Sequence, residues 1–296
     1  MSSLSALLNV NKPSGITSRD AVNRVQRLVR PAKVGHAGTL DPLASGVLVI
    51  AIGSATRLIE FVQQLPKRYR ATFLLGRSST TEDIEGEVTE LIEPPVPTRD
   101  EIESAAERLT GAILQRPPAF SALKVAGRRA YQLARRGETP ELAPRPVTIY
   151  QLSVVGYEYP VMELDIRCSS GTYVRSLGRD LAESLGTAAV MSALCRTAIG
   201  GFRIEGACEL DALDAASLPG HLLPPAKAVA HLRRHELSAE EVRSLRQGRP
   251  VPFRHERSDE LFAGYGPAGE LIGILSLSQP DLITSERILA YDRSGE

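Results

Sequence analysis

The sequence predicts an α+β fold, because strand and helix patterns alternate along the chain. Residues 162–168 place apolar side chains at every second position, which is typical of a strand with one buried face. The run from Val47 to Ile50 is rich in β-branched residues and predicts a second strand, buried in the core. Helices are indicated by apolar residues three or four apart, which follow capping boxes that begin at Thr17 and Thr98.

The composition is that of an ordinary globular chain with two domains. Its 296 residues suggest about two domains if ~150 residues per domain is taken as a prior, and 43% hydrophobic residues suffice for a core. The formal net charge is zero, so any contact with nucleic acid must come from local basic patches. Three scattered cysteines fit a reducing cytosol, so we expect a cytoplasmic protein. No signal-peptide pattern or membrane-spanning apolar run is found.

The remaining elements follow in chain order. Pro31 ends the helix that follows Thr17, and Gly111 stops the helix that follows Thr98. Residues 218–225 are rich in proline and indicate a linker near a domain boundary. The other expected elements are a helix at 56–64, strands at 71–76 and 147–157, helices at 174–185 and 239–248, and short strands at 260–263 and 271–277.

Two patterns that could suggest a metal or a cofactor are interpreted otherwise. His231 and His235 lie four residues apart, but nothing nearby completes a metal site, so both are interpreted as surface residues. Residues 264–269 satisfy the pattern GxGxxG, yet Pro267 and the strand that follows favour a hairpin turn over a dinucleotide site. We therefore expect neither a metal nor a nucleotide cofactor.

The stretch from Gly35 to Ile50, GHAGTLDPLASGVLVI, carries the candidate chemistry. Asp41 sits on a glycine-rich loop that leads into the buried strand, and Pro42 biases its backbone away from helical geometry. A carboxylate anchored in this way can be held in place while the backbone of a ligand comes close. Asp-Pro is also a common start of a turn, so the local pattern alone leaves a purely structural role open.

A second candidate region is the basic segment from Gln115 to Arg145. Such charge runs are usually solvated faces, but arginines with few acids also suit phosphate, which guanidinium groups bind in a fork. The local pattern leaves both interpretations open. The basic residues are Arg116, Lys124, Arg128, Arg129, Arg135, Arg136 and Arg145, against Glu138 and Glu141.

These stretches resemble the TruB family of bacterial tRNA pseudouridine synthases, which modify a uridine of the TΨC loop. The resemblance is carried by residues 35–50 and by the segments NKPSGITS, KRYRATFLLG, GTYVRSLGRDL and SALCRT. It implies a mixed or antiparallel sheet flanked by helices in a catalytic domain over residues 1–230. An RNA-gripping insertion is then expected at about 115–146, and a small β-rich PUA-like domain at 231–296.

The resemblance also implies roles for particular residues. Asp41 is expected to be the nucleophile, paired with Arg175, which keeps it ionised and positioned. Tyr69 is expected to pack against the target base, and Leu194 to line the uracil pocket. His36 is a candidate to fill the space that a flipped base leaves. The expected substrate-binding residues are His36, Lys12, Lys67, Tyr173, Leu194, Arg128 and Arg129. Three positions depart from the family pattern, namely Thr80, Phe120 and Cys195.

The implied activity is isomerisation of uridine 55 in the T stem-loop of tRNA, by a monomer that needs neither a cofactor nor an obligate protein partner. The carboxylate would attack C1′ of the sugar or the base ring, and the sequence leaves both open. A non-catalytic RNA-binding or RNA-folding protein would share the basic segment without needing Asp41. A glycosidase would normally require a second, paired carboxylic acid, which the signature loop lacks.

Overall fold

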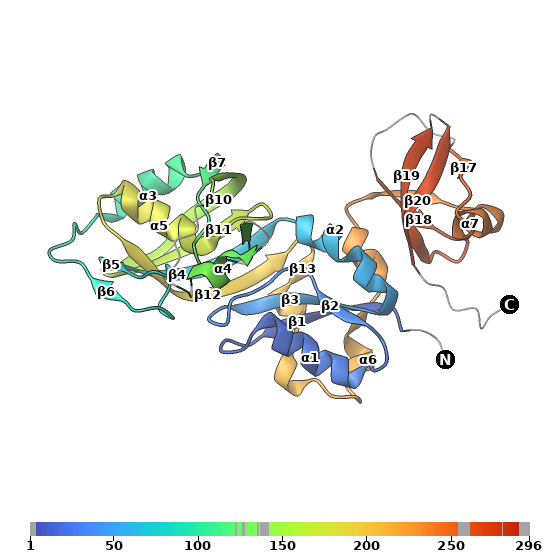
Figure 1. Ribbon diagram of the computed structural model, residues 1–296, viewed down its shortest axis with the longest axis horizontal. Helices are drawn as coiled ribbons and strands as arrows, with labels where there is room; N and C mark the ends of the chain where they lie inside the picture. Colours follow the sequence, from blue (N-terminus) through green and yellow to red (C-terminus); the bar gives the residue numbers. More distant parts are fainter. Residues whose placement is uncertain are drawn as a thin grey trace.

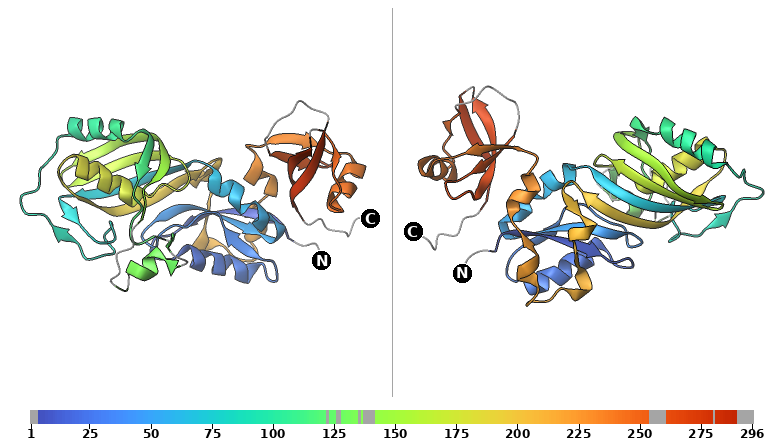
Figure 2. Two further views of the ribbon diagram at one scale, coloured as in Figure 1. Left: turned by 45° about the horizontal axis from the view of Figure 1, so that its top comes forward. Right: turned by 180° about the vertical axis from the view of Figure 1, so that it is seen from behind.

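The computed structural model describes residues 4–121, 123–125, 128–134, 136, 142–253, 261–279 and 281–289. The molecule is elongated, with a larger body built on one long sheet and a smaller sheet domain, drawn in orange to red, at one end (Figures 1 and 2). Within the described residues, no helix combines the length and the apolar composition needed to cross a membrane.

The main sheet runs through the whole larger body in the order β14-β1-β3-β12-β4-β11-β10-β7. Most neighbours are antiparallel, but β1 with β14 and β12 with β3 are parallel, so the sheet is mixed as expected. Its strands are β1 (Ala6–Lys12), β2 (Val34–His36), β3 (Ser45–Ile52), β4 (Lys67–Leu75), β7 (Gly111–Gln115), β10 (Arg145–Glu158), β11 (Val161–Cys168), β12 (Ala189–Ile199), β13 (Phe202–Arg203), β14 (Cys208–Glu209) and β15 (Leu222–Leu223).

Helices cover the faces of this sheet. Helix α1 packs on the half that contains β1 and β3, whereas α3 and α5 lie on the half that contains β4, β10 and β11 (Figure 1). The α-helices are α1 (Ser18–Leu28), α2 (Ile59–Gln64), α3 (Arg99–Arg108), α4 (Ala130–Ala134), α5 (Val174–Ser184), α6 (Leu218–His221) and α7 (Ala239–Arg246). The capping boxes at Thr17, Thr98 and Ser238 form and begin α1, α3 and α7, because each hydroxyl accepts the N3 backbone N–H.

Strand β3 is buried on both faces, as its β-branched sequence predicted. Val47, Val49 and Ala51 enter one apolar cluster, whereas Leu48 and Ile50 enter another, under α1. Successive side chains point to opposite faces of a strand, so β3 joins two cores. The strand that follows the Asp41 loop is therefore one of the most firmly packed elements of the fold.

The C-terminal residues form a second sheet in the order β16-β18-β19-β20-β17. It lies within the range 231–296 expected for the second domain, and its assignment as a PUA-like RNA-binding module stays a prediction. The GxGxxG segment forms the turn between β18 and β19, where the Gly266 N–H donates to the Glu270 carbonyl, so the hairpin prediction is confirmed. The strands are β16 (Arg233–Glu236), β17 (Val251–Pro252), β18 (Phe262–Tyr265), β19 (Leu271–Gln279) and β20 (Leu282–Ile288).

Two expectations about this region are wrong. The predicted linker at 218–225 is part of the larger body, because it forms α6 and then β15, which pairs with β1. His235 is buried on β16 against the rings of Phe253 and Phe262 instead of lying on the surface. In both places an apolar neighbour distant in sequence decides the structure.

The basic insertion is described in part. A short hairpin of β8 (Lys124–Val125) and β9 (Arg128–Arg129) is followed by α4, between β7 and β10. Of the predicted RNA-contacting residues there, Arg128 is exposed, whereas the side chain of Arg129 lies outside the described part.

Candidate active site

Asp41 lies on the loop between β2 and β3, and the backbone on both sides of it is held by hydrogen bonds. The Ser18 hydroxyl at the start of α1 accepts from the Leu40 N–H at 2.8 Å and donates to the Leu40 carbonyl at 3.1 Å. The Gly15 N–H donates to the Pro42 carbonyl at 2.8 Å. The segment NKPSGITS, which a plain turn and cap would explain, therefore also anchors the Asp41 loop.

Arg175 brings the buried positive charge of the site to Asp41. Its Nη2 lies 3.0 Å from Asp41 Oδ2, and the Arg175 side chain is 8% exposed, whereas the Asp41 side chain is 38% exposed. The guanidinium also donates to the carbonyls of Thr81 at 2.7 Å and Phe120 at 3.0 Å. These partners explain a cation in the first turn of α5, which the helix dipole disfavours. The ion pair leaves the nucleophile candidate open to a ligand while its partner stays fixed.

Asp83 is a third member of this network that the sequence interpretation missed. Its Oδ2 lies 3.4 Å from Arg175 Nη1, and its Oδ1 accepts from the Thr81 hydroxyl at 2.6 Å and from the Glu85 N–H at 3.1 Å. An acidic residue was expected at Thr80, but the carboxylate comes three residues later. Asp83 is buried, whereas Asp41 is partly exposed, so Arg175 contacts one carboxylate inside the protein and one at the surface.

Tyr69 and Leu194 lie beside the loop in one apolar cluster with Leu40 and Ala44. They sit on β4 and β12, which are paired, and each is no more than 9% exposed. Burial raises the pKa of the Tyr69 phenol, and the nearby positive charge of Arg196 acts in the opposite direction. The phenol therefore stays protonated at neutral pH, next to the Asp41 loop.

The two predicted substrate-binding lysines have their ammonium groups inside the protein. Lys12 Nζ donates to the carbonyls of Pro13 at 2.8 Å and Ile16 at 2.7 Å, and Lys67 Nζ donates to the Gln63 carbonyl. Burial, with Arg196 as the second cause, lowers the pKa of each amine to about 8. The contacts they make here are with backbone, and their role toward a substrate stays a prediction.

Of the other predicted site residues, His36 ends β2 and Tyr173 stands at the N-cap of α5. Burial and the nearby Arg19 lower the pKa of His36, whose Nδ1 is buried without a hydrogen-bond partner among the described residues. Gln115 fixes the backbone of Tyr173, accepting from its N–H at 2.8 Å and donating to its carbonyl at 3.1 Å. Within the described contacts, Arg128 makes no ion pair with Asp41.

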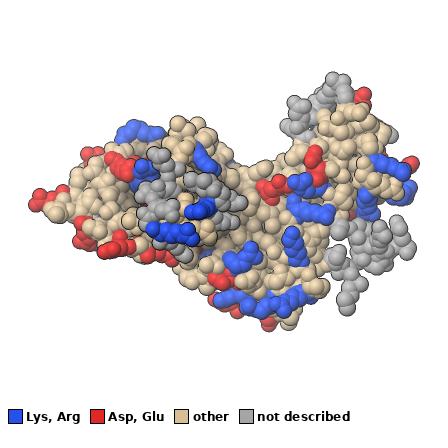
Figure 3. Space-filling model, in the orientation of Figure 1, with Lys and Arg blue, Asp and Glu red and all other residues tan. Residues whose placement is uncertain are grey.

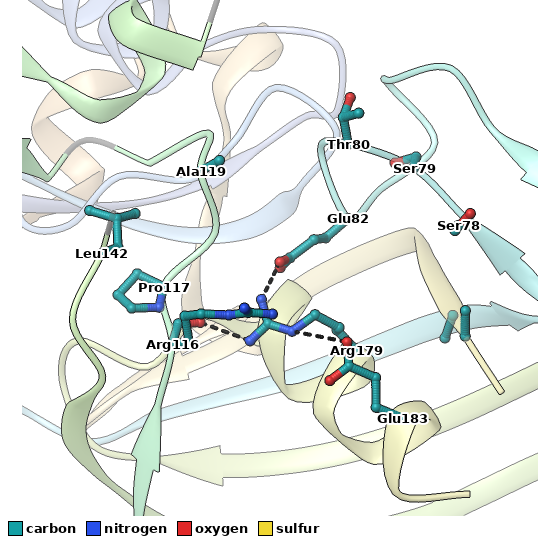
Figure 4. Close-up of a pocket in the computed structure, with 12 residues that line it drawn as sticks. Ser78, Ser79, Thr80, Glu82, Arg116, Pro117, Ala119, Leu142, Arg179 and Glu183 are labelled. Carbon is teal, nitrogen blue, oxygen red and sulfur yellow. Dashed lines mark hydrogen bonds and ion pairs between the residues drawn. The ribbon is translucent and has the colours of Figure 1, made fainter. Parts of the chain in front are cut away.

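A cavity of about 350 Å³ lies one turn along α5 from Arg175 (Figure 4). Its charged lining centres on Arg179, which pairs with Glu82 and Asp180 and donates to the Arg116 carbonyl at 2.9 Å. Thr80 lines this cavity and does not join the Arg175 network. The cavity is thus a neighbour of the Asp41 site and is not lined by Asp41.

The long mixed sheet carries an open carboxylate beside a buried guanidinium, a tyrosine and a leucine, which is the arrangement expected of a pseudouridine synthase. Solved structures share the fold: an archaeal box H/ACA Nop10–Cbf5 complex aligns with a TM-score of 0.73 at 22% identity, over 97% of this chain and 86% of that one. A Cbf5–Nop10–Gar1 complex aligns with a TM-score of 0.71 at 24% identity, over 97% and 84%.

The sequence then gives the particular family. Residues 26–174 match the family model described as "TruB family pseudouridylate synthase (N terminal domain)". The tRNA pseudouridine synthase B of Thermobifida fusca is 44% identical over 279 residues, which cover 90% of this chain and 92% of the relative. That of Mycobacterium tuberculosis is 40% identical over 271 residues, covering 90% of both chains. The chain belongs to the TruB family and is an RNA uridine isomerase, so the predicted family, fold class and enzyme class are confirmed.

Proposed function

We propose that this protein converts uridine 55 in the T loop of tRNA to pseudouridine, with Asp41 as the nucleophile. The observation that carries the proposal is the Asp41–Arg175 pair, in which a fixed guanidinium holds one oxygen of a carboxylate that is itself open to solvent. The relatives that are 40–44% identical are named tRNA pseudouridine synthase B, which supports tRNA as the substrate.

The reaction breaks the bond from N1 of the uracil to C1′ and forms a bond from C5 to C1′. An ionised oxygen of Asp41 would bond transiently to C1′ or to the base ring, and the detached uracil would rotate before C5 rejoins the sugar. The proton on C5 is lost and N1 gains one, so the reaction is balanced without an oxidant or a reductant. Because Arg175 contacts Oδ2, Oδ1 of Asp41 is the atom we assign to the attack.

The neighbours of Asp41 have separate tasks in this scheme. Tyr69 would stack on the extruded base, and Leu194 would form the apolar wall of the uracil pocket, since both border the Asp41 loop. A uridine inside a folded loop has to leave the stack to reach Asp41. His36 would then occupy the vacated space in the RNA.

Local basic surfaces would hold the tRNA, because the chain has no net charge. Lys and Arg side chains gather over α1 and on the C-terminal domain (Figure 3). The exposed arginines there are Arg19, Arg27 and Arg30 on or just after α1, and Arg243, Arg246 and Arg249 on or just after α7. We further propose that Lys12, Lys67, Tyr173, Arg128 and Arg129 assist binding, and that the protein acts in the cytoplasm as a monomer.

Tritium release from a tRNA transcript labelled at C5 of uridine tests the activity. We expect release with the wild type, mapped to the T loop, and none with Asp41→Asn, which keeps the size of the side chain but removes the nucleophilic charge. Asp100→Asn, on the exposed first turn of α3, is the matched control and should retain full release. A folded, tRNA-binding wild type without release would favour a non-catalytic RNA-binding protein, and release by Asp41→Asn would exclude Asp41 as the nucleophile.

A further inference from the structure

Arg196 on β12 is almost completely enclosed, and it touches the Asp41 loop without touching Asp41. It is 2% exposed, and it is among the largest side chains that the described core buries completely. Its Nη2 donates to the Gly38 carbonyl at 3.1 Å and its Nη1 to the Thr39 carbonyl at 3.3 Å. Its Nε donates to the Val47 carbonyl at 2.8 Å, so one guanidinium joins both ends of the loop that carries the nucleophile.

Arg196 also lies beside the second side chain of the site. Tyr69 lies directly opposite Arg196 in the antiparallel pairing of β4 with β12, so the two side chains are neighbours on one face of the sheet. The planar fork of arginine can serve several acceptors in fixed directions at once, which a lysine ammonium on a flexible stem cannot. Arg196 therefore holds the Asp41 loop through three hydrogen bonds and stands beside Tyr69 on the neighbouring strand.

This arrangement is electrostatically costly for a group with only a packing role. No described carboxylate forms an ion pair with Arg196. Its positive charge also lowers the pKa of two other buried amines, Lys12 and Lys67. A buried charge without an ionic partner is expensive, and backbone carbonyl dipoles offset the cost here. An apolar side chain would fill the same space more cheaply, so the hydrogen-bonding geometry is the feature that requires arginine.

The backbone at Arg196 is equally constrained. Gly46, at the start of β3, has a φ of +102°, and a Cβ there would come within 2.3 Å of the Arg196 carbonyl oxygen. Gly46 and Arg196 are partners in the parallel pairing of β3 with β12. The end of the Asp41 loop therefore has its position defined by the backbone of Arg196 as well as by its side chain.

We propose that Arg196 is a positioning residue, which sets the location of the Asp41 carboxylate relative to Tyr69 by holding the loop carbonyls beside the strand that carries Tyr69. This inference rests on the proposed function for its catalytic consequence. Arg196 does not contact the substrate in this scheme, because it is enclosed. Replacing the Arg196 guanidinium is expected to slow the chemical step and to leave the affinity for tRNA almost unchanged.

The test compares Arg196→Lys with a control, Arg203→Lys, which changes an exposed arginine on the adjacent β13. The first readout is hydrogen exchange, which does not depend on RNA. The Leu40 N–H is bonded to Ser18 and the Ala44 N–H to the Asp41 carbonyl. Exchange at both amides should accelerate at least about tenfold in Arg196→Lys alone, while β19 amides, far from the loop, should not change.

The second readout separates binding from chemistry. In single turnover with saturating tRNA, Arg196→Lys should lose about tenfold to a hundredfold in rate, because displacement of a reacting group by ~1 Å has that effect. The Kd for tRNA should stay within about threefold of the wild type. Methylguanidinium should raise the rate of Arg196→Ala but not that of Asp41→Asn, an effect that a general loss of folding would not produce.

Arg196→Lys with wild-type exchange and wild-type rate would overturn the proposal, as would a Kd that weakens by the same factor as the rate. If the variant cannot be obtained folded, hydrogen exchange of the wild type still tests the proposal. Slow exchange at the Leu40 and Ala44 amides would support an anchored loop, and exchange at the rate of an unstructured peptide would refute it. A wild type that is inactive on tRNA would refute the proposed function, while hydrogen exchange would still decide the role of Arg196.

Discussion

Replacing Gly178 with alanine should destabilise the protein, although alanine is the better helix former. Gly178 lies in α5, one turn after Arg175, and a Cβ at this position would fall 2.0–2.5 Å from three ring atoms of Phe73 on β4. Ordinary contact starts at 3.4 Å, so the helix and the ring must separate by about 1.4 Å. Phe73 is fully buried, and its strand partners Met162 and Met191 belong to the same core cluster.

Two effects of known size compete at this position. Alanine gains about 1 kcal/mol in helix propensity over glycine, whereas overpacking of a well-filled core costs about 1–3 kcal/mol. Because a buried ring cannot swing away as a flexible side chain would, we place the overpacking cost near ~3 kcal/mol and the net loss near ~2 kcal/mol. At about 2.1 cal/mol/K of unfolding entropy per residue, a loss of this size lowers the melting temperature of a 296-residue protein by about 3 °C.

The assay is thermal unfolding followed by circular dichroism, with tritium release measured on the same samples. Gly220→Ala is the matched control, because that glycine also lies in a helix, α6, yet a Cβ there would meet nothing within 4 Å. We expect the control to be neutral or slightly stabilised. Activity of Gly178→Ala should also fall, since α5 carries the guanidinium that lies 3.0 Å from Asp41. An unchanged or higher melting temperature for Gly178→Ala would refute the reasoning about Phe73.

Three further outcomes follow from buried polar contacts. Asp83→Asn should lose about 1.5–3 kcal/mol of stability, because an N–H donor of the new amide would face an N–H donor of Arg175 in place of the charge-assisted contact. The control Asp211→Asn removes an exposed ion pair with Arg24 and should change the melting temperature little. Equal shifts in melting temperature for the two variants would contradict this reasoning. Ser18→Ala should lower the free energy of unfolding by about 1–3 kcal/mol and reduce tritium release, because the Leu40 N–H would lose its hydrogen-bond partner. A variant with wild-type stability and full release would show that the Asp41 loop keeps its position without Ser18. Lys67→Met should melt higher than the wild type at pH 7, and this difference in melting temperature should shrink from pH 8 to 10.5. The pKa of Lys67 falls from 10.5 in the unfolded chain to about 8 in the folded protein. Between these values the unfolded wild type binds more protons than the folded one, so the stability of the wild type rises with pH. A pH-independent difference in urea unfolding would refute that assignment.

The parts of the fold that local chemistry determines could be predicted from the sequence. The capping boxes at Thr17 and Thr98 involve residues three apart, and both form. The two-sided burial of β3 follows from its run of apolar residues, which leaves no polar face for solvent. In each case the pattern and its physical cause lie within one segment of the chain.

The parts that could not be predicted depend on partners far apart in sequence. Arg196 acts on Gly38 and Thr39 across more than 150 positions, through a parallel pairing of β12 with β3 that no local pattern signals. Asp83 stands in an acidic segment where several carboxylates look alike, and only the position of Arg175 distinguishes it. Its one local signal is Thr81, two residues before it, whose hydroxyl bonds the carboxylate.

The shared core under β3 has a consequence for how this chain can change in evolution. Ala263, Ile274 and Leu289 of the C-terminal sheet belong to the same apolar cluster as Val47 and Val49, and Arg287 also pairs with Glu60 of α2 at 3.1 Å. Exchanging the tail for that of an unrelated protein would therefore remove part of the support beneath the strand that follows the nucleophile. Recombination at this joint should succeed only when the residues on both sides of it are inherited together, so the two domains are expected to evolve as one unit.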